Sequence, residues 1–227
     1  MKSMQSLSSQ QFLYRIVRYD RIVQMLSTDE WHFAHPSTWE DPYEMLIQNT
    51  LSPLLYAQCW CCKGSSDAMW RIYSPDKLGV QIRIRVDSLK SALHASMQQG
   101  NFGFRVSKVR YLNELEYVVH SSKIALDLST RVTFTRASAH LMLKRIAFEH
   151  EAETRVVAID LSAQTPNGAK GLKVKLDSKS LIESVVVDPR APDAFVDSYR
   201  HYLKEFLGYK GTVKKSQLYR SNAKREE

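Results

Sequence analysis

No run of apolar residues in this chain of 227 is long enough to cross a lipid bilayer. The first ten residues also contain no apolar stretch of the kind found in a secretory signal, so we expect residues 1–10 to be a loose leader. The three cysteines, Cys59, Cys61 and Cys62, are odd in number and bunched, which argues against a disulfide framework. Together these features favour a cytoplasmic protein with reduced thiols and no membrane partner.

The signature motifs of several enzyme classes are also missing. The sequence contains no Gly-x-Gly-x-x-Gly fingerprint, no Gly-Lys-Ser/Thr phosphate loop and no Gly-x-Ser-x-Gly nucleophile elbow. The Cys59-x-Cys61-Cys62 cluster has no second cysteine pair or nearby spaced histidines to complete a four-ligand zinc site. We therefore expect no metal, and we interpret these cysteines as buried residues of a core strand.

The balance of charge is basic. Thirty-two lysines and arginines against 24 acidic residues give a net charge of +8, which favours polyanionic partners such as nucleic acid or a phosphate-bearing ligand. Much of the excess lies in the last residues, where a solvated tail explains it equally well. The hydrophobic content of 44% and charged content of 25% are those of an ordinary globular protein.

The apolar periodicity predicts a mixture of strands and helices without repeats. Apolar and polar residues alternate most cleanly over 80–86, with Gln81, Arg83 and Arg85 facing outward. Further strands are expected at 12–17, 31–34, 54–62, 104–111, 172–176 and 182–187, and in the segment that carries Glu151 and Glu153. Helices are expected at 19–27, from Asp87 or Ser88 to Gly100, and at 113–127, 131–148 and 193–207, with a loop at 36–43.

The same pattern favours one domain. The only plausible linker, at 164–170, has the length of a hairpin-like loop. We therefore expect a single α+β domain over 11–209, followed by a terminal strand and basic tail over 210–227.

The stretch 148–159 carries the strongest sign of a site. If it is a strand, Glu151, Glu153 and Arg155 line one face, followed by Val157 and Ile159. Such a strand is buried at one end and opens into a pocket at the other. Two like charges on one face cost free energy unless an arginine, a ligand or a proton compensates them. A solvated face paired with Arg155 or a nearby lysine is the plainer alternative.

Two aromatic segments allow both a structural and a functional interpretation. Trp70 and Tyr73, three apart on a predicted helix, place two rings on the same side. These rings either pack in the core or form a wall that stacks on a flat heterocycle. The segment Trp39-Glu40-Asp41-Pro42-Tyr43-Glu44 is either a capped turn or the rim of a pocket with carboxylates and rings.

In this order the motifs resemble an uncharacterised bacterial family, Domain of Unknown Function 2971. The resemblance extends over 13–187 and rests on four motifs: Leu13-Tyr14-Arg15, the 39–44 segment, Met69-Trp70-x-x-Tyr73 with Gly79, and Lys144 before Glu151-x-Glu153-x-Arg155. Three residues depart from those usual in the family, namely Glu40 for Asn, Lys77 for His and Phe148 for Trp. The family implies no settled activity, and its bacterial setting suggests a toxin or phage-defence role.

A weaker resemblance is to ADP-ribosyltransferases. It rests on Tyr14-Arg15 in the first strand, a short helix and second strand after it, and the later Glu151-x-Glu153. It implies a mixed or antiparallel split sheet with flanking helices, and it implies NAD. A clear Ser-Thr-Ser strand, which those enzymes have, is missing here.

This second resemblance also implies roles for individual residues. Tyr14 and Arg15 would bind NAD, with Arg15 at its phosphates, and Trp70 and Tyr73 would pack near the nicotinamide. Glu153 would be the catalytic carboxylate, and Glu151 would assist the acceptor, a protein or a nucleic acid. Further pocket candidates are Trp39, Asp41, Glu44, Lys144 and Arg155.

Two other functions remain open. In a non-catalytic module, basic residues on neighbouring strands would bind nucleic acid, namely Arg83, Arg85, Arg105, Lys108 and Arg110. In a metal-dependent nuclease, four carboxylates would converge on magnesium beside Lys144, namely Asp41, Glu44, Glu151 and Glu153. The oligomeric state is not predicted.

Overall fold

The computed structural model of the protein describes residues 7–64, 66–162 and 170–220. Residues 1–6 of the expected leader, residues 164–169 of the hairpin-like loop expected at 164–170 and residues 221–227 of the basic tail lie outside these residues.

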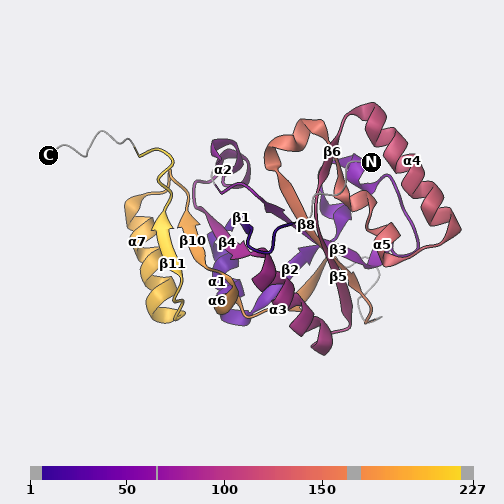
Figure 1. The fold of residues 1–227 in the computed structure, drawn as a ribbon. Coiled ribbons are helices and arrows are strands. Elements are labelled where there is room, and N and C mark those ends of the chain that lie inside the picture. Colours follow the sequence, from indigo (N-terminus) through magenta and orange to yellow (C-terminus); the bar gives the residue numbers. More distant parts are fainter. Residues whose placement is uncertain (1–6, 65, 163–169, 221–227) are drawn as a thin grey trace.

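A nine-stranded sheet forms the centre of the molecule (Figure 1). Its strands are β1 (Phe12–Arg18), β2 (Glu30–Ala34), β3 (Leu55–Cys61), β4 (Gly79–Arg85), β5 (Phe102–Lys108), β8 (Glu153–Asp160), β9 (Gly171–Lys175), β10 (Ser184–Val187) and β11 (Thr212–Lys215). The order is β11-β10-β4-β1-β3-β2-β9, with β8 paired to β3 and β5 to β8. Only β10 and β11 run parallel among these described neighbours. The predicted α+β class with a mixed, mainly antiparallel sheet is confirmed.

The sheet is split along one edge of β3. On one side β3 pairs with β8 along its whole length, from Leu55↔Ile159 to Cys61↔Glu153. On the other side it pairs with β1 only at Tyr14↔Cys61 and with β2 only at Ala34↔Ala57. The strands β1 and β2 therefore diverge from this edge, and the sheet separates into a β1-β4-β10-β11 half and a β3-β8-β5 half.

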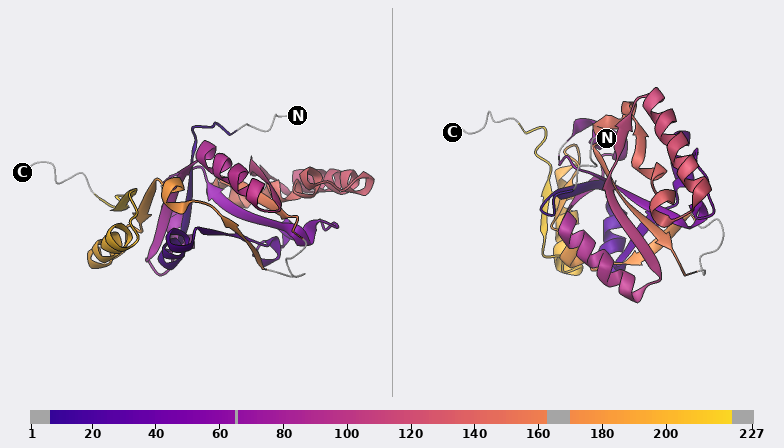
Figure 2. Two further views of the ribbon diagram at one scale, coloured as in Figure 1. Left: turned by 90° about the horizontal axis from the view of Figure 1, so that it is seen from below. Right: turned by 45° about the vertical axis from the view of Figure 1, so that its right-hand side comes forward.

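Helices pack around the two halves. They are α1 (Tyr19–Thr28), α2 (Asp67–Tyr73), α3 (Val86–Gln99), α4 (Glu114–Thr130), α5 (Phe134–Ala137), α6 (Ser178–Leu181) and α7 (Asp193–His201). In both views α7 lies at one end of the molecule and α4 at the other (Figures 1 and 2). Among the described residues, no helix combines the length and apolarity that crossing a membrane requires.

The predicted alternation of β4 is confirmed on its inner face. Val80, Ile82 and Ile84 are buried in the main core together with Leu13 and Trp60. Gln81, which was expected to face solvent, is also buried. Val86 begins α3 rather than ending the strand, so this helix starts one residue before the expected cap.

The helix predicted at 131–148 is wrong. Its place is taken by α5, the 3₁₀ turn η4 (His140–Met142), β7 (Leu143–Arg145) and the 3₁₀ turn η5 (Ile146–Glu151). β7 pairs in parallel with β6 (Arg110–Leu112), which separates from β5 at Val109 within the strand predicted at 104–111. The apolar residues three and four apart in this segment are buried as a helix would bury them, but they lie on short turns. These turns pack Ala137 and Leu141 against β8 in a second core.

Smaller differences concern the turns. The loop expected at 36–43 contains the 3₁₀ turns η1 (Pro36–Thr38) and η2 (Pro42–Met45), and η3 (Ser52–Leu54) leads into β3. The helix expected at 193–207 is α7 followed by the π-turn η6 (Tyr202–Phe206). It ends before Gly208, whose φ of 66° is the left-handed conformation that glycine adopts most readily.

Candidate functional site

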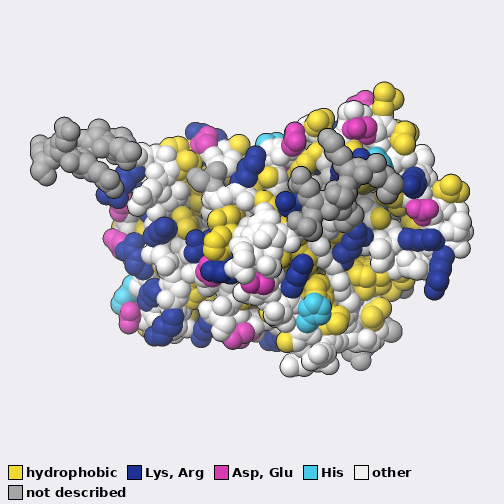
Figure 3. Space-filling model, viewed as in Figure 1, with side chains coloured by type: hydrophobic (Ala, Val, Ile, Leu, Met, Phe, Trp, Pro, Cys, Tyr) yellow, Lys and Arg dark blue, Asp and Glu magenta, His cyan; other side chains and the backbone are white. Residues whose placement is uncertain are grey.

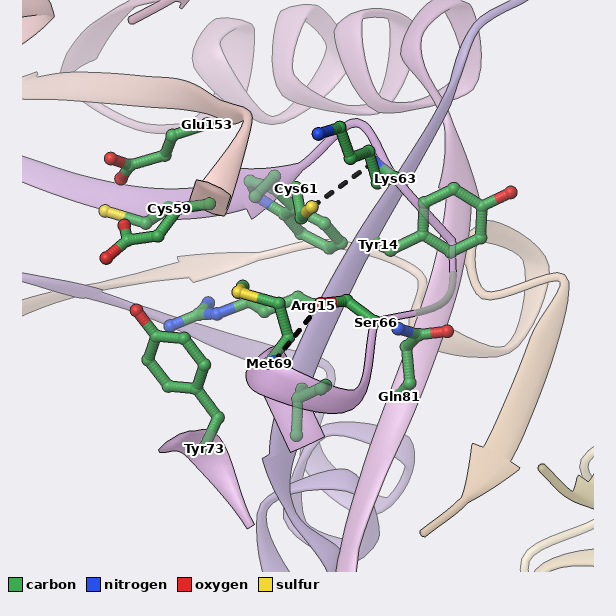
Figure 4. A pocket seen from close by; sticks show the side chains of 13 residues that line it. Tyr14, Arg15, Cys59, Cys61, Lys63, Ser66, Met69, Tyr73, Gln81 and Glu153 are labelled. Atoms are coloured by element: carbon green, nitrogen blue, oxygen red, sulfur yellow. Dashed lines mark hydrogen bonds between the residues drawn. The ribbon is translucent and has the colours of Figure 1, made fainter. Parts of the chain in front are cut away.

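A cavity of about 160 Å³ occupies the split between β1 and β3. Its walls include three consecutive residues of each strand, Tyr14, Arg15 and Ile16 from β1 and Cys59, Trp60 and Cys61 from β3. Successive side chains of a strand point to opposite faces, so a cavity that contacts all three must lie at the open edge of the strand. The divergence of β1 from β3 after the Tyr14↔Cys61 pair therefore creates this cavity (Figure 4).

Both predicted glutamates line the cavity, but they do not share a strand. Glu151 is the last residue of η5, and β8 begins only at Glu153. Between them Ala152 has a φ of 45°, which turns the chain out of the 3₁₀ turn and into the strand. The backbone N–H of Glu153 donates to the hydroxyl of Tyr111 at 2.7 Å, which fixes the first residue of β8.

Arg155 holds Glu153 from within the same strand. Its Nε and Nη2 lie 2.9 Å from the two carboxylate oxygens of Glu153, so the contact is bidentate. The guanidinium also binds Glu44, donates to the carbonyl of Leu141 at 2.7 Å and lies 4.5 Å from the ring centre of Trp39. With only 1% of its surface exposed, Arg155 is the centre of a buried network.

Lys144 joins the two glutamates. Its Nζ lies 2.6 Å from Glu151 and 3.3 Å from Glu153. Asp41 lies at the edge of this network, where it caps η2 and pairs with Arg145 at 3.1 Å. The structure thus brings together the residues predicted for the pocket around 39–44 and 144–155, and the compensation that the two like charges require comes from Arg155 and Lys144.

The network sets the charge of its members. Burial raises the pKa of Glu153, but Arg155 and then Lys144 outweigh burial and place this pKa below its ordinary value. For Glu44 burial is the larger effect, and its pKa lies above the ordinary value despite Arg155. Burial lowers the pKa of Lys144, but Glu153 and Glu151 more than reverse this. At neutral pH Glu153 is therefore an ionised carboxylate beside a cation.

Arg15 faces the same cavity without such partners. It follows Leu13 and precedes Val17 on the core face of β1, so a charge interrupts an apolar row. Among the described residues its guanidinium has no hydrogen bond or ion pair, and burial lowers its pKa. Cys59 and Tyr73 are the ionisable side chains next to it (Figure 4). Arg15 is half-buried, and a cation that is partly removed from water without a counter-charge costs free energy, which an anionic ligand in the cavity would offset.

The two interpretations of Trp70 and Tyr73 divide between the residues: Trp70 packs in the core, and Tyr73 contributes to the cavity wall. Tyr73 lines the cavity and is 43% exposed, whereas Trp70 is 1% exposed and is not among the lining residues of the described chain. In α2, which Ser66 caps, residues four apart share a face more closely than residues three apart. Met69 and Tyr73 therefore present the cavity side of this helix, and Trp70 packs inside.

Several lining residues were not predicted as site residues. Cys59 and Cys61 were assigned to the core, but both line the cavity, where burial raises the pKa of each thiol. Cys59 lies opposite Arg155 in the β3–β8 register, a pairing that only the fold reveals. Gln81, Lys63 and Ser66 complete the mouth of the cavity. The polar residues that follow the apolar strand, such as Lys63 and Ser66, are the sequence feature that could have indicated that the end of this strand borders a site.

The basic residues do not lie on neighbouring strands, which corrects that prediction. Arg83 and Arg85 belong to β4, whereas Arg105 and Lys108 belong to β5 and Arg110 to β6, and β1, β3 and β8 separate β4 from β5. The order of strands in the sheet differs from their order in the chain, and spacing in the sequence does not show this. On the face seen in Figure 3, lysines and arginines are scattered among other residues rather than gathered in one stripe.

The carboxylates proposed as magnesium ligands are bound to cations instead. Glu44 and Glu153 contact Arg155, Glu151 contacts Lys144, and Asp41 contacts Arg145. In the part of the chain that the structure describes, no group of three or more His, Cys, Asp or Glu residues has an arrangement that could hold a metal ion.

The chain is similar in fold to two solved structures and in sequence to one family model. No curated protein matches the sequence. Two structures of DarT from Thermus sp. 2.9, in complex with carba-NAD+ and with NAD+, are similar at TM-scores of 0.43 and 0.42. Each is 12% identical over 93% of this chain and 98% of that chain. A family model described as "Protein of unknown function (DUF2971)" matches residues 69–156. The resemblance to this uncharacterised family is thereby confirmed over the segment that carries Tyr73, Lys144, Glu151, Glu153 and Arg155.

Proposed function

We propose that this protein binds NAD in the split of the sheet and transfers its ADP-ribose group to a protein or nucleic-acid acceptor. One observation carries this proposal: an ionised carboxylate, Glu153, and a half-buried guanidinium without a partner among the described residues, Arg15, line the same cavity. The first suits a ribose at which positive charge develops, and the second suits a diphosphate.

Glu153 has the environment that the reaction needs. A carboxylate offers about four lone-pair positions, and the contacts from Arg155 and Lys144 occupy three of them. The Cys59 thiol also hydrogen-bonds to this carboxylate. Because a thiol is a weak donor, a ribose hydroxyl that bonds to Glu153 would take the place of Cys59. Because Arg155 and Lys144 hold the carboxylate ionised and fixed, it is oriented before the substrate arrives.

The chemical step is a substitution at the anomeric carbon of the nicotinamide ribose. The bond between C1′ and the ring nitrogen breaks, and nicotinamide leaves as a neutral molecule with the bonding electrons. The ribose gains oxocarbenium character, which the negative charge of Glu153 stabilises. An acceptor nucleophile then bonds to C1′ and releases its proton to water. Glu151, which Lys144 holds at the cavity wall, is the group that we propose to orient the acceptor.

Arg15 is the proposed diphosphate contact. A diphosphate would bring negative charge to a guanidinium that no described protein group neutralises, and a guanidinium can bind phosphate oxygens with two parallel hydrogen bonds. Tyr14 and Tyr73 flank Arg15 at the cavity and would contact the ligand on either side of it.

Release of nicotinamide from NAD tests this function. We expect the Glu153→Gln variant to release it at least about 100-fold more slowly, because the amide lacks the stabilising charge. Glu149→Gln is the matched control, since Glu149 lies four residues earlier, is exposed and has no side-chain partner among the described residues. Equal rates for Glu153→Gln and the unaltered protein would contradict the proposed role.

A binding measurement accompanies the kinetics. Calorimetric titration of the unaltered protein and both variants with NAD separates loss of chemistry from loss of the fold. An unaltered protein that neither binds NAD nor releases nicotinamide would overturn the proposed function as a whole.

A further inference from the structure

A second hollow, of about 540 Å³, adjoins the cavity. The two share Tyr14 and Gln81, so one continues into the other. We call the second hollow the β4–β11 groove. It lies on the β1-β4-β10-β11 half of the sheet, whose strands are side by side in Figure 1. Its floor consists of alternate residues of β4, β10 and β11, namely Gln81, Arg83, Ser184, Val186, Thr212 and Lys214.

The register explains why these side chains form one surface. Ser184 pairs with both Arg83 and Thr212, and Val186 pairs with both Gln81 and Lys214. Paired residues of neighbouring strands point to the same face of a sheet. The intervening residues of the same strands, such as Ile82, Val185 and Val213, are buried in the main core. The groove therefore occupies the polar face of this half of the sheet.

The cavity is too small for a whole dinucleotide. Sites that enclose a drug-sized ligand measure about 300 to 1,000 Å³, and NAD is at least as large as such ligands. A cavity of about 160 Å³ has room for the nicotinamide ribose beside Glu153, but the other half of the molecule must lie outside it. The adjoining groove is large enough to receive that half.

The chemistry of the groove fits a phosphate-bearing group. No acidic residue is among its lining residues in the described chain. Lys214 is exposed and has no partner among the described residues. Arg83 pairs with Glu183 at 3.2 Å through Nη2, and its Nε is buried without a hydrogen-bond acceptor among the described residues. Ser184, Thr212 and Ser216 add hydroxyl groups that can bond to phosphate or ribose oxygens.

We infer that the β4–β11 groove receives the adenosine-diphosphate half of NAD, with the diphosphate at the split between Arg15 and the groove. The inference rests on the proposed function, because it assumes that the nicotinamide ribose lies beside Glu153. Lys214 and Arg83 then contact phosphate oxygens, and the hydroxyl groups on β10 and β11 contact the adenosine.

Separate binding of the two parts of NAD tests this assignment. ADP, the part assigned to the groove, and nicotinamide mononucleotide, which carries the ribose assigned to the cavity, are titrated calorimetrically into the unaltered protein and three variants. Lys214→Glu reverses the unpartnered charge, and Thr212→Trp fills the groove from an edge strand, where a tryptophan is well tolerated. Lys210→Glu is the matched control, because Lys210 is an exposed lysine of the same segment outside the groove.

We expect Lys214→Glu and Thr212→Trp to weaken binding of ADP by about tenfold or more and to leave nicotinamide mononucleotide unaffected. Lys210→Glu should bind both ligands like the unaltered protein. Unchanged ADP affinity in both groove variants overturns the inference, and so does equal weakening of both ligands by Lys214→Glu. An unaltered protein that binds neither ligand contradicts the proposed function itself, which is a distinct outcome.

Discussion

Arg15 and Arg155 are two arginines from different halves of the sheet: Arg15 is half-buried and lines the cavity, and Arg155 is fully buried and binds Glu153 of the cavity wall. Arg155 binds two carboxylates and a carbonyl and lies against an indole ring, so its charge is fully compensated. Arg15 has none of these partners among the described residues. Removing an ion from water costs several kcal/mol, and only protein or ligand partners can recover that cost. The difference indicates that Arg155 organises the site and that Arg15 is kept for a ligand.

Removal of Arg155 should have the largest effect. Arg155→Met leaves Glu153 and Glu44 buried with one cation fewer, and we expect the free energy of unfolding to fall by about 3–5 kcal/mol. Urea denaturation of the variant and the unaltered protein measures this change. A loss below about 1 kcal/mol would show that the network does not organise the site.

The pH dependence of stability should distinguish the two carboxylates of Arg155. The pKa of Glu153 is lowered in the folded state, so its stabilising contribution is present above the ordinary value of 4.5 and is lost as the pH falls through the folded pKa. The pKa of Glu44 is raised, so its contribution is present below 4.5 and is lost as the pH rises through the folded pKa.

Unfolding of Glu153→Gln and Glu44→Gln at several pH values between about 3 and 7 checks these opposite signs. The deficit of Glu153→Gln relative to the unaltered protein should shrink towards acid pH, and that of Glu44→Gln should shrink towards neutral pH. The same trend in both variants would contradict the described network.

Removal of Arg15 should have the smallest effect on stability. Arg15→Met replaces a half-buried cation, which has no partner among the described residues, by an apolar side chain, so the free energy of unfolding should change by less than about 1 kcal/mol or rise. Arg18→Met, on the same strand but with a side chain that is 69% exposed, is the matched control. A loss of several kcal/mol for Arg15→Met alone would mean that Arg15 supports the fold.

The sequence predicted those parts of the fold in which one strand alone carries the pattern. The alternation of β4 and the charged-then-apolar face of β8 are examples, because period-two patterning follows directly from strand geometry. The segment 131–148 was mistaken for a helix because its apolar spacing also suits a series of turns against β8. The basic residues were wrongly placed on neighbouring strands because the order of β4 and β5 in the sheet is a tertiary property that local patterns do not contain.

Only part of the candidate site was predicted, because some of its residues are recognisable by their chemistry and others are placed there only by the tertiary fold. Glu153, Arg15 and Tyr73 carry chemistry that stands out in a sequence, and all three line the cavity. Cys59 looks like an ordinary core residue in the sequence. It lines the cavity only because β1 diverges from β3 beside it. Trp70 shows the opposite error, because a conspicuous ring can simply be buried.

Calorimetric titration of NAD into Arg15→Met, with Arg18→Met and the unaltered protein beside it, tests the central claim most directly. We predict that Arg15→Met binds NAD at least about tenfold more weakly while it stays as stable as the unaltered protein, because a charged contact to phosphate is lost. Arg18→Met should bind normally. Equal NAD affinity in Arg15→Met and the unaltered protein would contradict the claim that the unpartnered guanidinium in the split is kept for the dinucleotide.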